Sequence, residues 1–289
     1  MTIAISPLQA IEDLRAAVDL QQAIVGERDP SIWRLPHLFH AQQSGGLLLG
    51  ARTGFSQDTG SLDGVLVDLL AVMDGYSACR TVVWGVCPKA RSCGIGTKLR
   101  LIERTTLQKE AIDLAYWDID PLDGIELHVA LNKLGGILTG YSRDSLGSTR
   151  DSRAPGLATD RVRCEWWIDA PSVIDRLDNE HAPPHQRIGL QAMTVLTKTT
   201  TLASGVRGII ECDLSPTAEH LLAEIPEDFN ALQARDRDAA IQWRLQGRNL
   251  IEQLFQLGYI GIGLMHEGGR SFLLFKKGTR RTELGAVQK

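Results

Sequence analysis

A segment with two glycines, Arg91-Ser92-Cys93-Gly94-Ile95-Gly96, constrains the fold of this chain more than any other feature. It follows Thr81–Val86, a short apolar run with the β-branched character of a strand. After it, Ile95, Leu99, Ile102 and Thr106 recur on one helical face. This period predicts a helix over residues 94–110. The segment is therefore expected to be a strand-to-helix turn within a mixed α/β fold.

Such a turn exposes backbone N–H groups that have no partner inside the helix. The helix dipole adds partial positive charge at the same place, which favours a phosphate group. Glycines allow the phosphate to approach the backbone, although a glycine pair is equally consistent with a purely structural turn. Gly96-Thr97-Lys98 does not match a P-loop, and Leu99 stands where a dinucleotide fingerprint needs its third glycine.

Around this turn the chain alternates strand and helix patterns. A helix is expected over residues 7–25, with Ser6 as its N-cap and Pro7 in the first position. A short helix should follow at 33–42, a β-hairpin at 45–70 and a loose stretch at 74–80. Further expected elements are a strand at 112–119, a helix around 127–134 that ends at Gly135-Gly136, strands at 137–141, 162–168 and 206–214, a helix at 236–257, and a hairpin at 258–275.

Composition excludes several classes of protein. The chain has 289 residues, and its net charge of -4 does not suggest a nucleic-acid partner. No apolar run approaches the about 20 residues of a membrane-spanning helix, and the N-terminus does not resemble a secretory signal. The five cysteines are scattered and form no CxxC pair, which argues against a disulfide framework or a zinc site. No metal is expected. We expect a cytoplasmic protein with reduced cysteines.

The stretch from Val86 to Gly96 resembles the acyl-CoA loop of GNAT acyltransferases, whose core is Arg/Gln-x-x-Gly-x-Gly/Ala. The resemblance implies that the co-substrate is acetyl-CoA or another acyl-CoA and that backbone N–H groups of the loop bind its pyrophosphate. It assigns coenzyme binding to Val86, Arg91, Ser92, Cys93, Gly94, Ile95 and Gly96.

The resemblance extends along most of the chain. Tyr116–Leu122, Thr159-Asp160-Arg161 and Glu165-Trp166-Trp167 are similar to an uncharacterised bacterial branch of predicted GNAT proteins. Many members of the superfamily use a tyrosine as the acid that protonates the leaving thiolate, and Leu131 stands at the counterpart position here. This departure leaves the acid of the reaction unassigned.

Three residues are candidates for moving a proton: Asp120, Glu126 and His128. Asp120 follows a strand, where a carboxylate can orient or deprotonate an amine; the alternative is that it ends the strand and caps the next helix. Glu126 stands where the branch typically carries asparagine, which marks either a changed acceptor or drift on a solvated face. His128 is suited to proton transfer near neutral pH, or is structural. Arg244 and Arg248, four residues apart, are expected to form ion pairs on the helix surface; the alternative is that they bind an anionic group.

The sequence thus predicts an α/β chain with a mixed sheet: a GNAT-like acyl-CoA-binding domain over residues 1–170, a linker over 171–205, and a smaller C-terminal α/β part over 206–289 that packs on the core. Its expected function is N-acylation of a small-molecule amine by direct attack on the thioester. Two alternatives stay open: a non-catalytic acyl-CoA-binding module, and another reaction on an acyl thioester. A homodimer is compatible with the sequence, which names neither the acceptor nor the acyl chain.

Overall fold

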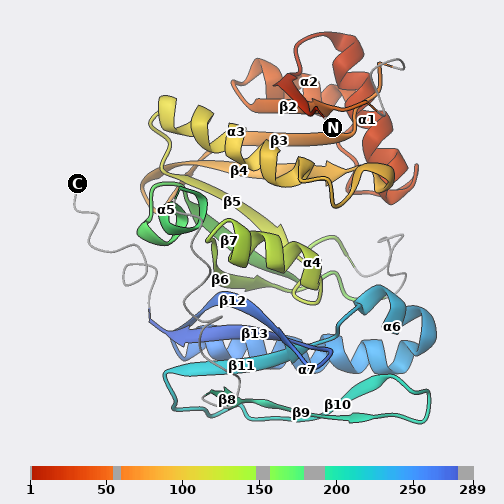
Figure 1. Ribbon diagram of the computed structural model, residues 1–289, viewed down its shortest axis with the longest axis vertical. Coiled ribbons are helices and arrows are strands. Elements are labelled where there is room, and N and C mark those ends of the chain that lie inside the picture. The colour runs from red at the N-terminus through yellow and green to blue at the C-terminus, as the bar shows by residue number, and fades with distance from the viewer. Residues whose placement is uncertain (1, 55–59, 148–156, 179–192, 279–289) are drawn as a thin grey trace. The chain divides into compact units, whose positions relative to one another are not determined.

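The computed structural model describes residues 2–54, 60–147, 157–178 and 193–278. The chain forms two compact units, Met1–Trp117 and Asp118–Lys289. Each unit contains both helices and strands (Figure 1), so the expected mixed α/β class is confirmed.

The sheet of the first unit has the strand order β1-β2-β3-β4-β5. Neighbouring strands are antiparallel from β1 to β4, whereas β4 and β5 are parallel and are connected by α3. The elements in chain order are β1 (Ala4–Pro7), α1 (Ile11–Val25), α2 (Leu35–Gln43), β2 (Leu47–Arg52), β3 (Gly64–Met73), β4 (Tyr76–Val86), the 3-10 helix η1 (Pro88–Ala90), α3 (Ile95–Lys109) and β5 (Leu114–Ile119), which continues into the second unit.

The two faces of β3 bury different helices because its side chains alternate. Val65 and Val67 pack with buried residues of α1 and α2, whereas Leu66 packs with Ile95 and Leu99 of α3. Gly64 lets α3 lie close to the strand, since a Cβ atom there would come within 2.6 Å of Ile95 Cγ2. The helix that follows the two-glycine segment is thus fixed against the centre of the sheet.

Two local expectations for this unit are wrong. Ser6 and Pro7 belong to β1, which pairs with β2, and α1 begins only at Ile11 with Ala10 as its N-cap. The stretch expected to be loose is the first half of β4, because Asp74 and Gly75 make a tight turn with positive φ and return the chain to pair with β3. The other expected helices and strands of this unit are confirmed.

The second unit contains a sheet with the strand order β7-β6-β12-β13-β11-β8 and a separate β9–β10 hairpin. Most of its pairs are antiparallel, and β8 and β11 are parallel. Its elements are α4 (Gly124–Leu127), the π-helix η2 (His128–Lys133), β6 (Ile137–Ser142), β7 (Arg161–Trp167), α5 (Pro171–Leu177), β8 (Thr194–Val195), β9 (Thr197–Thr201), β10 (Arg207–Cys212), β11 (His220–Ile225), α6 (Phe229–Arg235), α7 (Arg237–Gln256), β12 (Tyr259–Glu267) and β13 (Arg270–Lys277).

The expected helix at 236–257 and the terminal hairpin are confirmed as α7 and β12–β13. The sequence patterns missed α5, β8, β9, β11 and α6. The stretch predicted as a linker, 171–205, contains α5, β8 and β9, while its residues 179–192 lie outside the described part of the chain. Elements after residue 206 pack on earlier ones within this unit, since β12 pairs with β6 at Gly261 and Leu138. The predicted domain limits stay a prediction.

The helix expected around residues 127–134 widens into a π-helix at His128–Lys133. Asn132, in the middle of this turn, donates from Nδ2 to the Leu264 carbonyl oxygen at 2.6 Å and accepts from the Leu264 N–H at 3.0 Å. Gly135 ends the helix with a φ of 76°, and the Ser172 carbonyl oxygen would lie 2.9 Å from a Cβ atom there. Glycine is therefore required at this helix end both by conformation and by close packing.

Candidate functional site

The loop between β4 and α3 begins with ordered backbone contacts. Cys87 donates its N–H to the Asp63 carbonyl oxygen at 2.9 Å, and the buried Ala90 donates to Cys87 at 3.0 Å. Arg91 and the next three residues are then exposed. Ser92 and Gly94 both have positive φ, 62° and 79°, so the chain turns sharply before the helix. Val86, the last residue of β4, is partly buried.

The N-terminus of α3 opens at Gly94. The first helical hydrogen bond runs from the Lys98 N–H to the Gly94 carbonyl oxygen at 3.0 Å. The N–H groups of Ile95, Gly96 and Thr97 precede it and lack a helical acceptor, which is the arrangement that binds anions. The first turn of α3 carries no acidic residue, so no carboxylate there competes for an anion.

The two glycines of the loop have different reasons to be glycine. Gly94 needs its left-handed conformation, and nothing lies within 4 Å of a Cβ atom built there. At Gly96 the backbone is helical, and a Cβ atom would make only ordinary contact, 3.5 Å from the Trp84 ring. Packing within the protein therefore does not require Gly96, whereas close approach of a ligand to the backbone would favour it.

Beneath the loop, α3 is attached to the sheet by fully buried charges. Arg100 donates from Nη1 to both carboxylate oxygens of Glu103, at 3.0 and 2.9 Å, and to Thr81 Oγ1 at 2.8 Å. Its guanidinium carbon lies 4.3 Å from the Trp84 ring centroid and 3.8 Å from that of Trp117. These contacts on β4 and β5 fix the helix whose N-terminus faces the loop.

Asp120, the first proton-transfer candidate, lies at the start of the second unit just after β5. Its two oxygens accept from Arg244 Nη1 and Nη2, each at 2.7 Å, and Oδ1 also accepts from the Leu122 N–H at 2.9 Å. Arg161 approaches within 3.8 Å. Both oxygens of the carboxylate are therefore occupied by Arg244, which leaves Asp120 engaged in an ion pair.

Glu126 and His128 lie on the turn from α4 into η2. The cap of α4 is Asp123, whose Oδ1 accepts from the Ile125 and Glu126 N–H groups at 3.1 and 3.0 Å, so the alternative of Asp120 as this cap is wrong. The Glu126 side chain is partly buried.

His128 is exposed, and its Nδ1 lies 3.2 Å from Asn132 Nδ2. Partial desolvation of the ring, followed by the charge of Lys133, lowers the pKa of His128 below its usual value. An exposed imidazole that is neutral at pH 7 is able to accept a proton.

Leu131, which the sequence resemblance matched to the usual tyrosine, is completely buried. A hydroxyl group that the sequence did not single out is that of Tyr141 on β6, which donates to Asp160 Oδ2 at 2.7 Å. Arg248 also donates to Asp160, from Nε at 2.8 Å and Nη2 at 2.7 Å. The expected ion pairs of Arg244 and Arg248 are present, with Asp120 and Asp160 as partners. The Arg244 side chain is only 3% exposed, so its pair does not lie on the helix surface as expected.

The seven residues proposed to bind coenzyme A, Val86 and the unbroken stretch Arg91–Gly96, all belong to the first unit. Asp120, Glu126 and His128 belong to the second. Within the second unit, Asp120 is engaged by α7, while Glu126 and His128 share one short helical turn. Of these three, His128 combines exposure with a lowered pKa, so it is the best placed to exchange a proton with solvent or a ligand.

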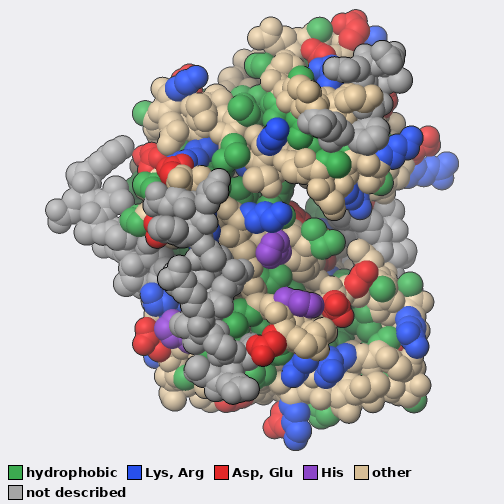
Figure 2. Space-filling model, in the orientation of Figure 1, with side chains coloured by type: hydrophobic (Ala, Val, Ile, Leu, Met, Phe, Trp, Pro, Cys, Tyr) green, Lys and Arg blue, Asp and Glu red, His purple; other side chains and the backbone are tan. Residues whose placement is uncertain are grey.

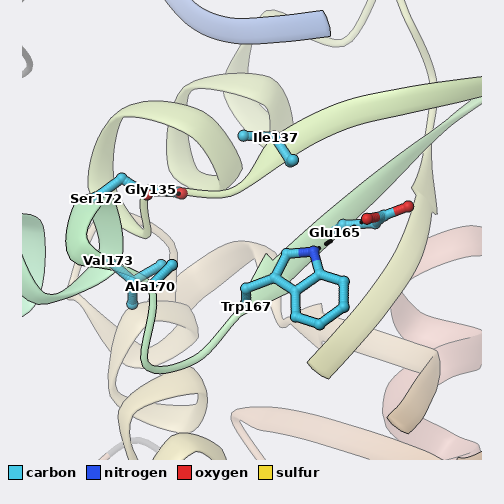
Figure 3. A pocket seen from close by; sticks show the side chains of 7 residues that line it. All are labelled: Gly135, Ile137, Glu165, Trp167, Ala170, Ser172 and Val173. Atoms are coloured by element: carbon cyan, nitrogen blue, oxygen red, sulfur yellow. Dashed lines mark hydrogen bonds between the residues drawn. The ribbon is translucent and has the colours of Figure 1, made fainter. Parts of the chain in front are cut away.

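A small cavity in the second unit is not a substrate site. Gly135, Glu165, Trp167 and Ser172 are among its walls, and Figure 3 shows Trp167 pointing toward Glu165. Trp167 Nε1 donates to Glu165 Oε2 at 3.0 Å. The volume is about 10 Å³, room for about one water molecule.

Among the described residues, no group of three or more His, Cys, Asp or Glu side chains is arranged to hold a metal ion. No helix in the described ranges combines the length and apolar character needed to cross a membrane.

No protein-family model and no curated protein matches the chain. Solved structures that resemble it include N-acetyltransferases. One is the ribosomal-protein-S18-alanine N-acetyltransferase from Escherichia coli, with 17% identity, 58% of this chain and 94% of that chain covered, and a TM-score of 0.43. Another is an N-acetyltransferase from Staphylococcus aureus Mu50, with 15% identity, 58% and 100% covered, and a TM-score of 0.45. A third is the NatC complex bound to Gag peptide and CoA, with 16% identity, 57% of this chain and 98% of that chain covered, and a TM-score of 0.48.

Proposed function

We propose that this chain is a GNAT-type N-acyltransferase that takes an acyl group, most simply acetyl, from coenzyme A and transfers it to the amine of a small molecule. The observation that carries the proposal is the exposed turn at Arg91–Gly94, which leads into a helix N-terminus free of acidic residues. A helix N-terminus of this kind suits the pyrophosphate of coenzyme A. Gly96, which packing does not require to be glycine, fits a backbone that a phosphate approaches closely.

In this reaction the ammonium proton first passes to a base, and the neutral amine nitrogen forms a bond to the thioester carbonyl carbon. The carbon–sulfur bond then breaks, coenzyme A leaves as a thiolate, and a second proton lost from the nitrogen is balanced by protonation of that thiolate. We assign the base to His128, because its lowered pKa keeps the imidazole neutral at pH 7. Asp120 is the weaker candidate, because Arg244 holds both of its oxygens. Glu126 lies two residues before His128 in the chain. At that position its negative charge is suited to attract an ammonium group.

The non-catalytic alternative is supported by Leu131. This side chain is fully buried where many acyltransferases place the tyrosine that protonates the thiolate. A chain that binds acyl-CoA without turnover would retain the loop and lack this acid. The two functions are distinguished by turnover.

The first test is isothermal titration calorimetry of the full chain with acetyl-CoA, coenzyme A and longer acyl-CoAs. We expect binding that weakens as salt is raised, because the phosphates supply much of the attraction. Arg91→Ala should weaken binding several-fold, and Lys89→Ala, an exposed neighbour before the loop, is the matched control. Absence of binding to every one of these ligands would refute the assignment.

The second test measures release of free thiol from acetyl-CoA in the presence of a panel of small amines and short peptides. Turnover with a small amine supports the proposal. Turnover only with peptides would assign the acceptor to a protein N-terminus or lysine instead. Binding without turnover across both panels would favour the non-catalytic function.

A further inference from the structure

A second pocket, unrelated to the Arg91–Gly96 loop, opens in the second unit. It has a volume of about 310 Å³ and is bordered by β10, β11, α6 and the β12–β13 turn. This volume is at the lower end of the range of about 300–1,000 Å³ for small-molecule sites. Its charged lining residues are three arginines and three acids: Arg207, Arg235, Arg270, Glu224, Glu227 and Asp228. Figure 2 shows basic and acidic side chains close together on the surface of this unit.

Glu224 organises two of the arginines. Its side chain is 1% exposed, and it accepts hydrogen bonds from Thr199 Oγ1 at 2.8 Å and from Nε of Arg270 at 3.0 Å, with a second bond from Arg270 Nη2. Arg207 Nε lies 3.5 Å from the same carboxylate. One buried carboxylate thus holds two guanidinium groups at the wall of the pocket, so these three side chains together carry one net positive charge.

Arg235, at the end of α6, supplies the third guanidinium group. It is exposed, and within the described part of the chain it forms no hydrogen bond or ion pair. A guanidinium group that lines a pocket and has no carboxylate of its own presents its donors to a ligand. Because the group is planar, it suits a carboxylate bound through both oxygens.

The negative charges of the pocket that face solvent come from the segment between β11 and α6. Glu227 and Asp228 are both exposed, and Asp228 uses Oδ1 to accept the Ala231 N–H at 2.9 Å. The pocket therefore offers guanidinium donors and exposed carboxylate acceptors to the same small molecule. A ligand with a single charge would leave one of these sets without a partner.

We propose that this pocket binds a free α-amino acid, with its carboxylate on Arg235 and Arg270 and its ammonium group toward Glu227 and Asp228. The zwitterion satisfies both sets of charges at once. The site belongs to the second unit alone, so the proposal does not depend on the acyltransferase function.

The test is calorimetry of the full chain with each of the common α-amino acids, followed by two analogues of every amino acid that binds. One analogue lacks the amine and the other carries an amide in place of the carboxylate. We expect at least one amino acid to bind with a dissociation constant in the millimolar range or tighter, and each analogue to bind at least tenfold more weakly. No binding by any amino acid, or equal binding by the analogue without an amine, would overturn the proposal.

Arg235→Gln ties the binding to this pocket. Because Arg235 is exposed and unpaired among the described residues, the variant should fold, and its affinity for the amino acid should fall at least tenfold. Lys198→Gln removes one positive charge from the surface of the same unit, outside the pocket lining, and should bind like the unmodified chain. Unchanged affinity in Arg235→Gln would overturn the proposal, and an equal loss in both variants would reduce it to a general charge effect.

Discussion

Arg100 and Glu103 form an ion pair one helical turn apart on α3, and neither side chain is exposed to solvent. Nη1 of Arg100 lies 3.0 and 2.9 Å from the two Glu103 oxygens. The guanidinium carbon of Arg100 lies over the rings of both Trp84 and Trp117, within the range of a cation–π interaction. The charged pair therefore fixes the helix that begins at the proposed coenzyme loop.

Arg100→Leu should destabilise the protein by about 3–5 kcal/mol, because it leaves the Glu103 carboxylate buried without its partner. The double variant Arg100→Leu with Glu103→Leu removes both charges and should recover part of that loss. Urea unfolding of both variants at the same pH measures the difference. A double variant less stable than Arg100→Leu would show that the pair is not the source of the effect.

Asp68 on β3 adds a second fully buried carboxyl to the same region. Burial raises its pKa, and the charge of Arg100 opposes this only in part; burial likewise raises the pKa of Glu103 well above its usual value. Since the single guanidinium group of Arg100 faces the two carboxyl groups of Asp68 and Glu103, the folded protein retains a proton on this pair that the unfolded chain releases above about pH 4. The stability that this carboxyl pair contributes to folding is therefore present at low pH and is lost as the pH rises through the raised pKa.

Asp68→Asn should accordingly gain stability relative to the unmodified protein as the pH rises from about 4 toward neutrality, with a slope of at most about 1.36 kcal/mol per pH unit. Urea unfolding at a series of pH values measures it. Glu12→Gln, which alters an exposed carboxylate on α1, is the control. A difference between Asp68→Asn and the unmodified protein that stays constant with pH would contradict the retained proton.

The two loop glycines should respond differently to alanine. Gly94→Ala places a side chain at a φ of 79° and should cost about 1–2 kcal/mol of stability, together with coenzyme affinity. Gly96→Ala meets only ordinary contact with Trp84 in a helical conformation, so it should be neutral or stabilising by up to about 1 kcal/mol. Thermal unfolding and acetyl-CoA calorimetry of both variants check this. Equal losses of stability would mean that the left-handed turn is not what distinguishes them.

If His128 is the base, activity should depend on its neutral form. Its pKa is lowered, so the rate should fall on the acid side only below about pH 6.5. Lys133→Gln removes a charge that lowers this pKa and should move the fall in kcat/KM to higher pH. Lys109→Gln, at the end of α3, should leave the profile unchanged. His128→Gln with an unaltered pH profile would exclude this histidine as the base.

Local patterns predicted α3, α7 and the β12–β13 hairpin because helical periodicity and glycine turns act within a few residues. The edge strand β1 was missed since Ala4–Pro7 is extended only through its pairing with β2, almost fifty residues later. The π-helix was missed for a similar reason, because Asn132 in that turn bonds to the backbone of Leu264.

The sequence by itself determined the strand, the two-glycine turn and the helix that follows, and so the exposed helix N-terminus at which we propose that coenzyme A binds. Only the tertiary structure decided which charges are available for chemistry. It paired Asp120 with Arg244, 124 residues away, and buried Arg100 with Glu103. The strength of a charge depends on its partners and on its exposure to water, and both are set by packing between elements distant in the chain.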